Sequence, residues 1–187
     1  MKNLAKTGAV YDGTINGVFT PANPLIRCKK TKCMDFGGVN EWLTSANPIS
    51  ALSIYSIVFW FNDDVIDKVF LSPTVTANYY LQHAVLNNRI AFSFPGNPFL
   101  STMGSPLNVT RMVAVVSDGT YRRCYLDGVK DRVVGSAPVY SNDANVYIGR
   151  YSAGGFEFNG RLDNMMFYNI ALTPAQIQSI WRSANPR

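Results

Sequence analysis

The sequence contains few of the residues on which most active sites depend. Its 187 residues include one histidine, three cysteines and two glutamates. The longest apolar run, residues 54–61, is far shorter than the roughly 18 residues that a membrane-spanning helix needs. The amino terminus has a lysine but no uninterrupted apolar stretch of the kind found in secretory signals. We therefore expect no membrane span, no signal peptide and a location in a virion or in the cytoplasm.

The composition is that of a folded domain rich in strands. Hydrophobic residues make up 47% of the chain and charged residues 16%, which excludes the composition of disordered chains. Aromatic residues reach 13%, and planar side chains favour strands. Because no linker, repeat or change of composition divides the chain, we expect residues 1–187 to form a single all-β domain.

Short apolar runs separated by turn signals follow one another along the chain. Residues 54–61 are apolar on both alternating faces, which predicts a central strand. Asp118-Gly119 and Asp127-Gly128 are hairpin turn signals. Other strands are expected at residues 32–43 (two strands about Gly37-Gly38), 65–71, 78–85, 89–94, 112–116, 121–126, 130–134, 146–148 and 162–168, with an edge hairpin at 8–19 and a loose segment at 95–106. About a dozen strands at this spacing predict a two-sheet antiparallel sandwich.

One short helix is predicted near residues 174–183. Thr173 can cap it, Pro174 suits its first position, and Gln176 can complete a capping box. Leu172 can pack on the first turn. The apolar residues of the helix share one face: Ile177, Ile180, Trp181 and Ala184. We expect this face to lie against a sheet edge and to seal the core.

A resemblance to a known family is concentrated in residues 160–177, GRLDNMMFYNIALTPAQI. This segment resembles the last strand and closing helix of the laminin-G-like, concanavalin A-like jelly-roll family. RMVAVVSDG at 111–119, RCYLDG at 123–128 and CMDFGGVNEW at 33–42 resemble other strands of that family. The resemblance covers about residues 8–182 and implies a jelly-roll sandwich with one short C-terminal helix. It does not imply one function, because the family includes lectins, adhesion modules, hydrolases and virion parts.

Two features bear on partners. The family's usual first strand is absent or altered, which predicts an open sheet edge near residues 8–19 that a structural protein or another copy would cover. The net charge is +5, which suits acidic partners. The one basic cluster consists of Arg27, Lys29, Lys30 and Lys32. We interpret this cluster as a solvated loop, since the chain has no nucleic-acid motif.

The cysteines allow more than one state. Cys28 and Cys33 are close enough in sequence to form a disulfide across a turn, whereas Cys124 has the pattern of a small buried hydrophobic residue. Without a signal peptide we favour three free thiols in a reducing cytosol. A zinc site lacks ligands, because the single histidine is distant in sequence.

Residues that could catalyse a reaction are sparse. Glycoside hydrolysis needs two carboxylates roughly 5–10 Å apart. Glu41 and Glu157 both lie beside turns. Asp63, Asp64 and Asp67 are three carboxylates close in sequence, but Asp63 and Asp64 have the pattern of a solvated turn after a strand. His83, the single histidine, could serve as the base of a polysaccharide lyase with Tyr79 or Tyr80 as the acid, but we interpret it as a surface or hydrogen-bonded residue. We expect no catalytic residue.

Calcium is the cofactor that the resemblance brings into question. Asp163 matches the first acidic position of the family's pair, but Asn164 replaces the second acid, and Asp12 matches an early loop position only loosely. A neutral ligand weakens a calcium site. We therefore expect no metal or other cofactor, and we interpret Asp163 as bonded to backbone donors.

Sugar binding would use exposed aromatic rings with amides beside them. The candidates are Tyr79, Tyr151, Phe156 and Trp42, with Asn78 or Asn159 alongside. The sequence does not place them on one face, because core or edge packing explains each equally well. No ligand-binding site is assigned from sequence.

We predict a non-catalytic binding or adhesion module, in the first instance a decoration or fibre protein of a phage-like virion that binds surface glycans. The size, the missing export signal and the expected free thiols favour the virion. The alternatives are a cellular carbohydrate-binding lectin and a polysaccharide lyase or glycoside hydrolase.

Overall fold

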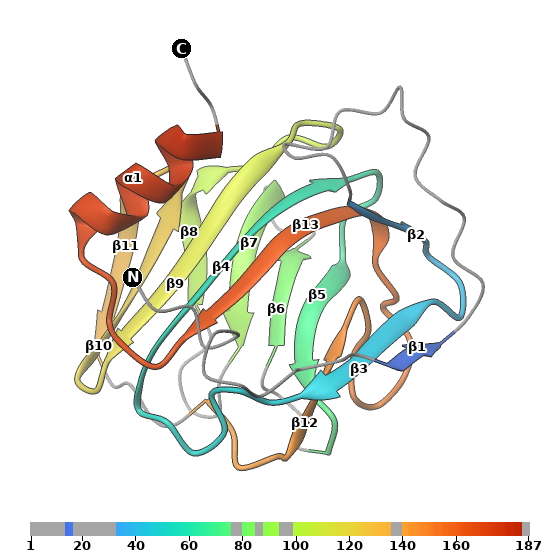
Figure 1. The fold of residues 1–187 in the computed structure, drawn as a ribbon. Coiled ribbons are helices and arrows are strands. Elements are labelled where there is room, and N and C mark those ends of the chain that lie inside the picture. Colours follow the sequence, from blue (N-terminus) through green and yellow to red (C-terminus); the bar gives the residue numbers. More distant parts are fainter. Residues whose placement is uncertain are drawn as a thin grey trace.

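A computed structural model describes residues 14–16, 33–75, 80–84, 88–93, 99–135 and 140–184. In this part of the chain, thirteen strands and one helix form a two-sheet sandwich (Figure 1). The seven-stranded sheet has the order β1 (Thr14–Asn16), β3 (Trp42–Ala46), β12 (Asn145–Ile148), β5 (Lys68–Pro73), β6 (Tyr80–Ala84), β7 (Arg89–Ser93) and β8 (Phe99–Gly104). The six-stranded sheet has the order β11 (Val129–Gly135), β10 (Tyr121–Leu126), β9 (Arg111–Asp118), β4 (Ile54–Asp63), β13 (Asn159–Tyr168) and β2 (Met34–Gly37). The strand pairs are antiparallel, which confirms the predicted all-β sandwich.

The core between the sheets is built on β4. Tyr55, Ile57, Phe59 and Phe61 alternate along this strand, face the other sheet and are fully buried. Phe70 of β5 meets them, with ring centroids 5.3 Å from Phe59 and 4.8 Å from Phe61. Burying each such side chain stabilises the fold by about 1.5–3 kcal/mol. The central position predicted for this strand is confirmed.

Helix α1 (Pro174–Ala184) packs on the outer face of the six-stranded sheet near its β11 edge (Figure 1). The second face of β4, with Val58 and Trp60, forms an apolar cluster with β9, β10 and the helix. Ile177 and Ala184 are buried in this cluster, while Ile180 and Trp181 pack against it, as the helix pattern predicted. The expectation that the helix lies against a sheet edge is confirmed, because α1 contacts β11, the edge strand of this sheet, and its apolar residues close this cluster.

The start of α1 is capped as the sequence predicted. The Thr173 N–H donates to Gln176 Oε1 at 2.8 Å, and the Gln176 N–H donates to Thr173 Oγ1 at 3.3 Å. The two residues thus satisfy each other's backbone donors. Leu172 and Ile177 lie in the same buried cluster beside this cap.

Two segments differ from the sequence prediction. The loose segment expected at 95–106 contains β8, which pairs with β7 and closes one side of the sandwich, where the Met103 N–H donates to Asp131 Oδ1 at 2.9 Å. The strands on either side of Gly37-Gly38 do form, but β2 and β3 belong to different sheets. The prolines at 98 and 106 flank β8, and they gave its segment the pattern of a loop. Which sheet β2 or β3 joins is not specified by local sequence.

The edge hairpin expected at residues 8–19 lies mostly outside the described residues. Within it, β1 pairs with β3 at an edge of the seven-stranded sheet. The predicted open edge stays a prediction. Among the described residues, no helix has the length and apolar character needed to cross a membrane.

Candidate functional site

The outer face of the seven-stranded sheet carries the candidate site. Val146 of β12 and Leu81 of β6 are buried in the core, so their strand neighbours Tyr147 and Tyr80 project from the opposite face. Trp42 of β3 joins them, because its neighbour Leu43 pairs with Ile148 on the inner side. Unlike the outer face of the other sheet, this one is not covered by α1.

The loop between β12 and β13, residues 149–158, is fixed to this sheet by its backbone. The Gly149 N–H donates to the Phe70 carbonyl at 2.9 Å, and the Val69 N–H donates to the Phe156 carbonyl at 3.0 Å. Ser72 Oγ donates to the Arg150 carbonyl at 2.9 Å. Since the loop is tied to β5 on both sides of Tyr151, its side chains have a defined place over the sheet.

We name the side chains gathered here the Arg150 cluster: Trp42, Tyr80, Tyr147, Arg150, Tyr151, Phe156 and Glu157. The guanidinium carbon of Arg150 lies 4.1 Å from the centroid of the Trp42 ring and 5.8 Å from that of Tyr147. The Tyr151 ring contacts Tyr80 and Phe156 edge-on, with centroids 5.3 and 6.1 Å apart. Stacking of a cation on an aromatic face at this distance is attractive.

The charges of the cluster are only loosely paired. Arg150 Nε and Glu157 Oε1 are 4.0 Å apart, with side-chain exposures of 26% and 19%. This distance is too long for a hydrogen bond, and Arg150 Nε has no hydrogen-bond partner among the described residues. Gly154, at φ +82°, passes close to the guanidinium, because a Cβ there would lie 3.2 Å from Arg150 Nη2.

The cluster combines half-buried rings with one cation and one carboxylate. Aromatic rings on a rigid surface contact the apolar faces of sugars, while charged and amide groups bind hydroxyl or carboxylate oxygens. Phe156 is 47% exposed, and the other rings of the cluster are of intermediate exposure. The arrangement can bind a polar ligand without a metal.

The structure brings three of the predicted sugar-binding residues together, namely Trp42, Tyr151 and Phe156. Tyr79 and Asn78 lie outside the described residues. Asn159 lies on β13 opposite Gly37, in the other sheet.

Sequence reasoning missed Tyr147 and Arg150, and it considered Tyr80 only as an acid. The alternation of Tyr147 with Val146 and Ile148 could have indicated its outward direction. Nothing in the sequence indicated that Arg150 stacks on Trp42, since the two residues lie in distant segments.

Of the residues considered for catalysis, Tyr80 and Glu157 lie in the Arg150 cluster, whereas the other carboxylates lie elsewhere. Asp63 is fully buried at the end of β4, so its prediction as a solvated turn residue is wrong, whereas Asp64 is exposed and Asp67 is of intermediate exposure. Glu41 accepts the Gly37 N–H. His83 lies on β6 opposite Lys68 and Ile90.

The residues considered for calcium lie apart from the Arg150 cluster. Asp163 is 9% exposed and pairs with Trp60, and the β13 strand shifts register just beyond it. Asn164 follows at φ 50°, and Asp12 is outside the described residues. In the described part of the chain, no three acidic, histidine or cysteine side chains gather in a way that could hold a metal ion.

One cysteine expectation is corrected. Cys33 is disulfide-bonded, so the prediction of three free thiols is wrong. Cys28 lies outside the described residues. Cys124 is a free, fully buried core residue, as predicted, and burial raises the pKa of its thiol well above the usual range.

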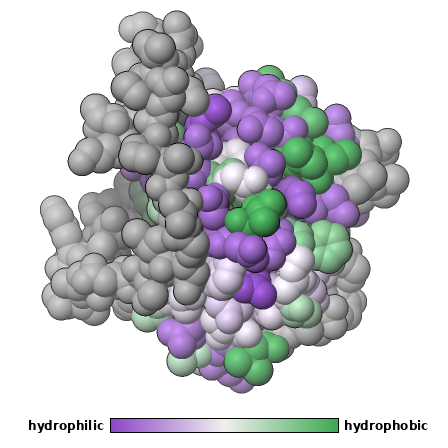
Figure 2. Space-filling model, turned by 90° about the vertical axis from the view of Figure 1, so that its right-hand side faces the viewer, coloured by the Kyte–Doolittle hydropathy of each residue, from purple (hydrophilic) through white to green (hydrophobic). Residues whose placement is uncertain are grey.

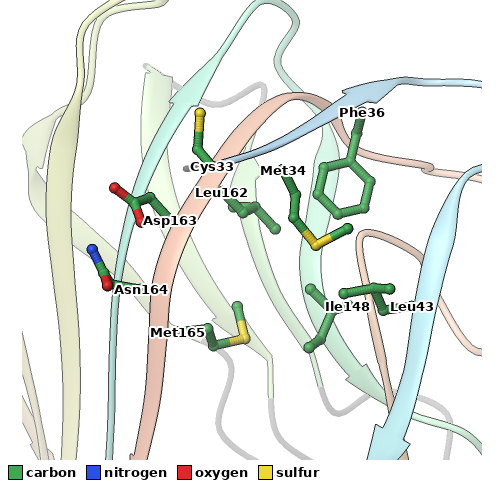
Figure 3. Close-up of a pocket in the computed structure, with 9 residues that line it drawn as sticks. All are labelled: Cys33, Met34, Phe36, Leu43, Ile148, Leu162, Asp163, Asn164 and Met165. Atoms are coloured by element: carbon green, nitrogen blue, oxygen red, sulfur yellow. The ribbon is translucent and has the colours of Figure 1, made fainter. Parts of the chain in front are cut away.

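A cavity of about 210 Å³ opens between β2 and β13 of one sheet and β3 and β12 of the other. Figure 3 shows its apolar side chains converging, among them Met34, Leu43 and Met165, while the polar ends of Asp163 and Asn164 point away. The cavity lining is therefore apolar. Among the described residues that line it, the polar ends do not point inward, so they would not orient a hydrophilic ligand there.

The described residues on the side of the molecule with β1 and β2 are predominantly hydrophilic. Figure 2 shows hydrophobic residues there as separate small groups among hydrophilic ones. Scattered exposed apolar residues of this kind are normal on protein surfaces.

Solved structures share the fold. Domain 4 of AbnA, a GH43 extracellular arabinanase from Geobacillus stearothermophilus in complex with arabinotriose, matches with a TM-score of 0.77 at 18% identity, over 95% of this chain and 92% of that one. The binding domain of Paraclostridial Mosquitocidal Protein 1 matches with a TM-score of 0.71 at 12% identity, over 95% of this chain and 48% of that one. The receptor-binding domain of a botulinum neurotoxin C/D mosaic serotype matches with a TM-score of 0.69 at 11% identity, again over 95% and 48%. The chain thus spans about half the length of these toxin domains, and identities this low show the fold alone.

A family model shows to which superfamily the chain belongs. No curated protein sequence matches the chain. The model of the concanavalin A-like lectin/glucanases superfamily matches residues 36–178, which include most of both sheets and the start of α1. The chain belongs to the concanavalin A-like lectin/glucanases superfamily.

Proposed function

We propose that this chain is a non-catalytic module that binds glycans through the Arg150 cluster. The observation that carries the proposal is the contrast between the two outer faces of the sandwich. One face carries α1 near its β11 edge, while the other presents the half-buried rings of Trp42 and Tyr147 against Arg150, together with the Tyr80–Tyr151 ring pair. The superfamily includes lectins by its description, and domain 4 of AbnA was solved with arabinotriose. These relationships support a sugar as the ligand.

The surroundings of the carboxylates support the non-catalytic part of the proposal. Glu157 faces the Arg150 guanidinium, Glu41 accepts a backbone N–H, and Asp63 is buried. A hydrolase needs an acid and a second carboxylate on opposite sides of one bond. The enzymatic alternative predicts release of products from a panel of polysaccharides, abolished by His83→Ala in folded protein.

The virion-surface role remains a separate prediction. Its grounds were the size of the chain and the expected free thiols. The disulfide at Cys33 removes the last ground, since disulfides persist mainly in oxidising environments. A cellular lectin would use the same sugar-binding face, so glycan binding alone does not distinguish the two.

The test is a glycan array with the purified protein and two tyrosine variants. Tyr151→Ala removes the ring that contacts both Tyr80 and Phe156, and we expect binding to fall about tenfold or more, the effect of losing one stacked ring. Tyr121→Ala is the matched control, because Tyr121 is a 46% exposed tyrosine of the other sheet. Absence of binding to every glycan, or equal loss in both variants, would contradict the proposal.

A further inference from the structure

We propose that the glycan bound at the Arg150 cluster carries a carboxylate, as in a uronic or sialic acid, and that Arg150 selects it. This inference rests on the proposed function and names the chemical class of its ligand. Four features of the cluster support it.

The first feature is that the Arg150 guanidinium is held in place before any ligand arrives. The Arg150 backbone carbonyl accepts a hydrogen bond from Ser72 Oγ at 2.9 Å. The guanidinium lies over the Trp42 ring, with its carbon 4.1 Å from the ring centroid. A planar guanidinium presents donors that match the two oxygens of a carboxylate. Because the head is already oriented, less side-chain entropy is lost when it binds an anion.

The second feature is that Arg150 is incompletely paired within the protein. Its ion-pair distance to Glu157 is 4.0 Å, longer than that of Arg161 with Asp35 at 3.7 Å and much longer than the close pairs of Arg111 with Asp127 at 2.5 Å and Arg123 with Asp118 at 2.6 Å. A structural arginine is normally paired as Arg111 and Arg123 are. A cation at a sheet surface with a distant counter-ion retains donors for an incoming oxyanion.

The third feature concerns the rings. A neutral sugar would stack on an open aromatic face, but the guanidinium already lies over one face of Trp42. Trp42 therefore positions Arg150 on that side. Tyr147 adds a second ring beside the cation, with its centroid 5.8 Å from the guanidinium carbon, and a lower local dielectric strengthens a charged contact.

The fourth feature is the charge of Glu157, whose removal should change the affinity for acidic and for neutral ligands in opposite directions. Its carboxylate beside Arg150 repels an acidic ligand, and removing its charge should strengthen binding of that ligand. For a neutral sugar, Glu157 would instead accept hydroxyl hydrogen bonds, so the same substitution would weaken binding. Glu157→Gln should therefore raise the affinity for an acidic ligand but lower the affinity for a neutral sugar.

The experiment is calorimetric titration with two pairs of probes, trigalacturonate against its methyl ester and 3′-sialyllactose against lactose. We expect one acid to bind about tenfold or more tightly than its uncharged partner, because hydrogen bonds to charged groups are the stronger ones. Which pair shows the preference distinguishes uronic from sialic acid. Binding should weaken as salt rises from about 50 to about 500 mM, because salt screens exposed charges.

Three variants complete the test. Arg150→Gln should lower acid binding about tenfold or more, Glu157→Gln should raise it, and Arg182→Gln should leave it unchanged, because Arg182 is an exposed arginine on α1 at the opposite face. If Arg150→Gln does not fold, the inference is still tested by whether Glu157→Gln raises or lowers the affinity for the acidic probes. Equal binding of acids and neutral partners, or weaker acid binding by Glu157→Gln, would overturn this inference while glycan binding stands. Absence of binding to every probe and every array glycan would overturn both proposals.

Discussion

Gly128 and Trp181 lie in direct contact where α1 crosses the β10–β11 hairpin. A Cβ placed on Gly128 would come 3.2 Å from the Cβ of Trp181, and the Gly128 backbone has φ +78°. Only glycine adopts this conformation at little cost. The turn that joins the two strands therefore also gives the helix room to approach.

Gly128→Ala should lower the free energy of unfolding by about 1–3 kcal/mol, from the positive φ and from crowding against Trp181. Urea unfolding measures the change. Gly155→Ala is a useful comparison, because Gly155 also has a positive φ but nothing lies within 4 Å of its added Cβ. An effect of Gly128→Ala no larger than that of Gly155→Ala would show that the helix contact contributes nothing.

Trp181→Ala should cost less than removal of a fully buried ring, since Trp181 is of intermediate exposure. Deleting a core Trp costs about 3–5 kcal/mol, so we expect about half of that. The urea midpoint gives the value. An unchanged midpoint would mean that the ring adds nothing to the packing of α1 on the sheet.

Ser56→Ala should destabilise the protein by about 1–3 kcal/mol, because it leaves a buried donor unpartnered. Ser56 is fully buried on β4; its Oγ donates to the Ile170 carbonyl at 2.8 Å and accepts the Leu172 N–H at 2.9 Å. These bonds hold the segment that leads into α1. Thermal unfolding is the measurement, with the exposed Ser179→Ala as the control, and equal melting temperatures for the two variants would contradict the prediction.

The contribution of Asp118 to stability should disappear in acid. Backbone N–H groups of Tyr121 and Thr120, with the Arg123 guanidinium, lower the pKa of this carboxyl to about 2. A lowered pKa stabilises the fold above the unfolded value of about 4, and that stabilisation is lost as the pH falls from about 4 toward 2. The side chain is 29% exposed, so solvent screening reduces the effect to about 1 kcal/mol.

Asp118→Asn tests this pH dependence through urea midpoints measured at several pH values. The variant should be less stable than the original protein at pH 7, and the difference should shrink toward pH 2. A difference that stays constant between pH 7 and pH 2 would exclude the carboxylate as its source.

Cys124 should resist thiol reagents until the protein unfolds. It is fully buried, and burial raises the pKa of its thiol, so little reactive thiolate forms. Under non-reducing conditions, mass spectrometry after alkylation should find label on Cys124 only in denaturant, and none on the disulfide-bonded Cys33. Rapid labelling of Cys124 in the native protein would contradict its burial.

Local signals in the sequence predicted much of the fold. The two apolar faces of residues 54–61 identified β4 as a central strand, and the order Thr173, Pro174, Gln176 gave the capped start of α1. Both depend on neighbours within a few residues. By contrast, the sequence did not reveal which sheet α1 packs on or that β2 and β3 separate into different sheets, because these depend on the long-range pairing of strands.

The candidate site was less accessible from sequence for the same reason. Trp42, Tyr151 and Phe156 were suspected from residue type, but their joint position depends on β3 pairing with β12 and on the loop that follows. Arg150 is a candidate because its guanidinium lies over the Trp42 ring, a contact between distant segments. A single arginine after a strand carries no local signal of a binding role.

The placement of α1 also determines which end of the molecule suits attachment to a support. The helix lies on one outer face and the Arg150 cluster on the other, with two sheets about 10 Å apart between them. An attachment made at the carboxyl end of α1, whether a sensor chip, a bead or a second protein, therefore presents the Arg150 cluster away from the support. The same attachment at β3 or at the 149–158 loop would block it, so tethering through α1 is the orientation in which sugar binding is measured without obstruction.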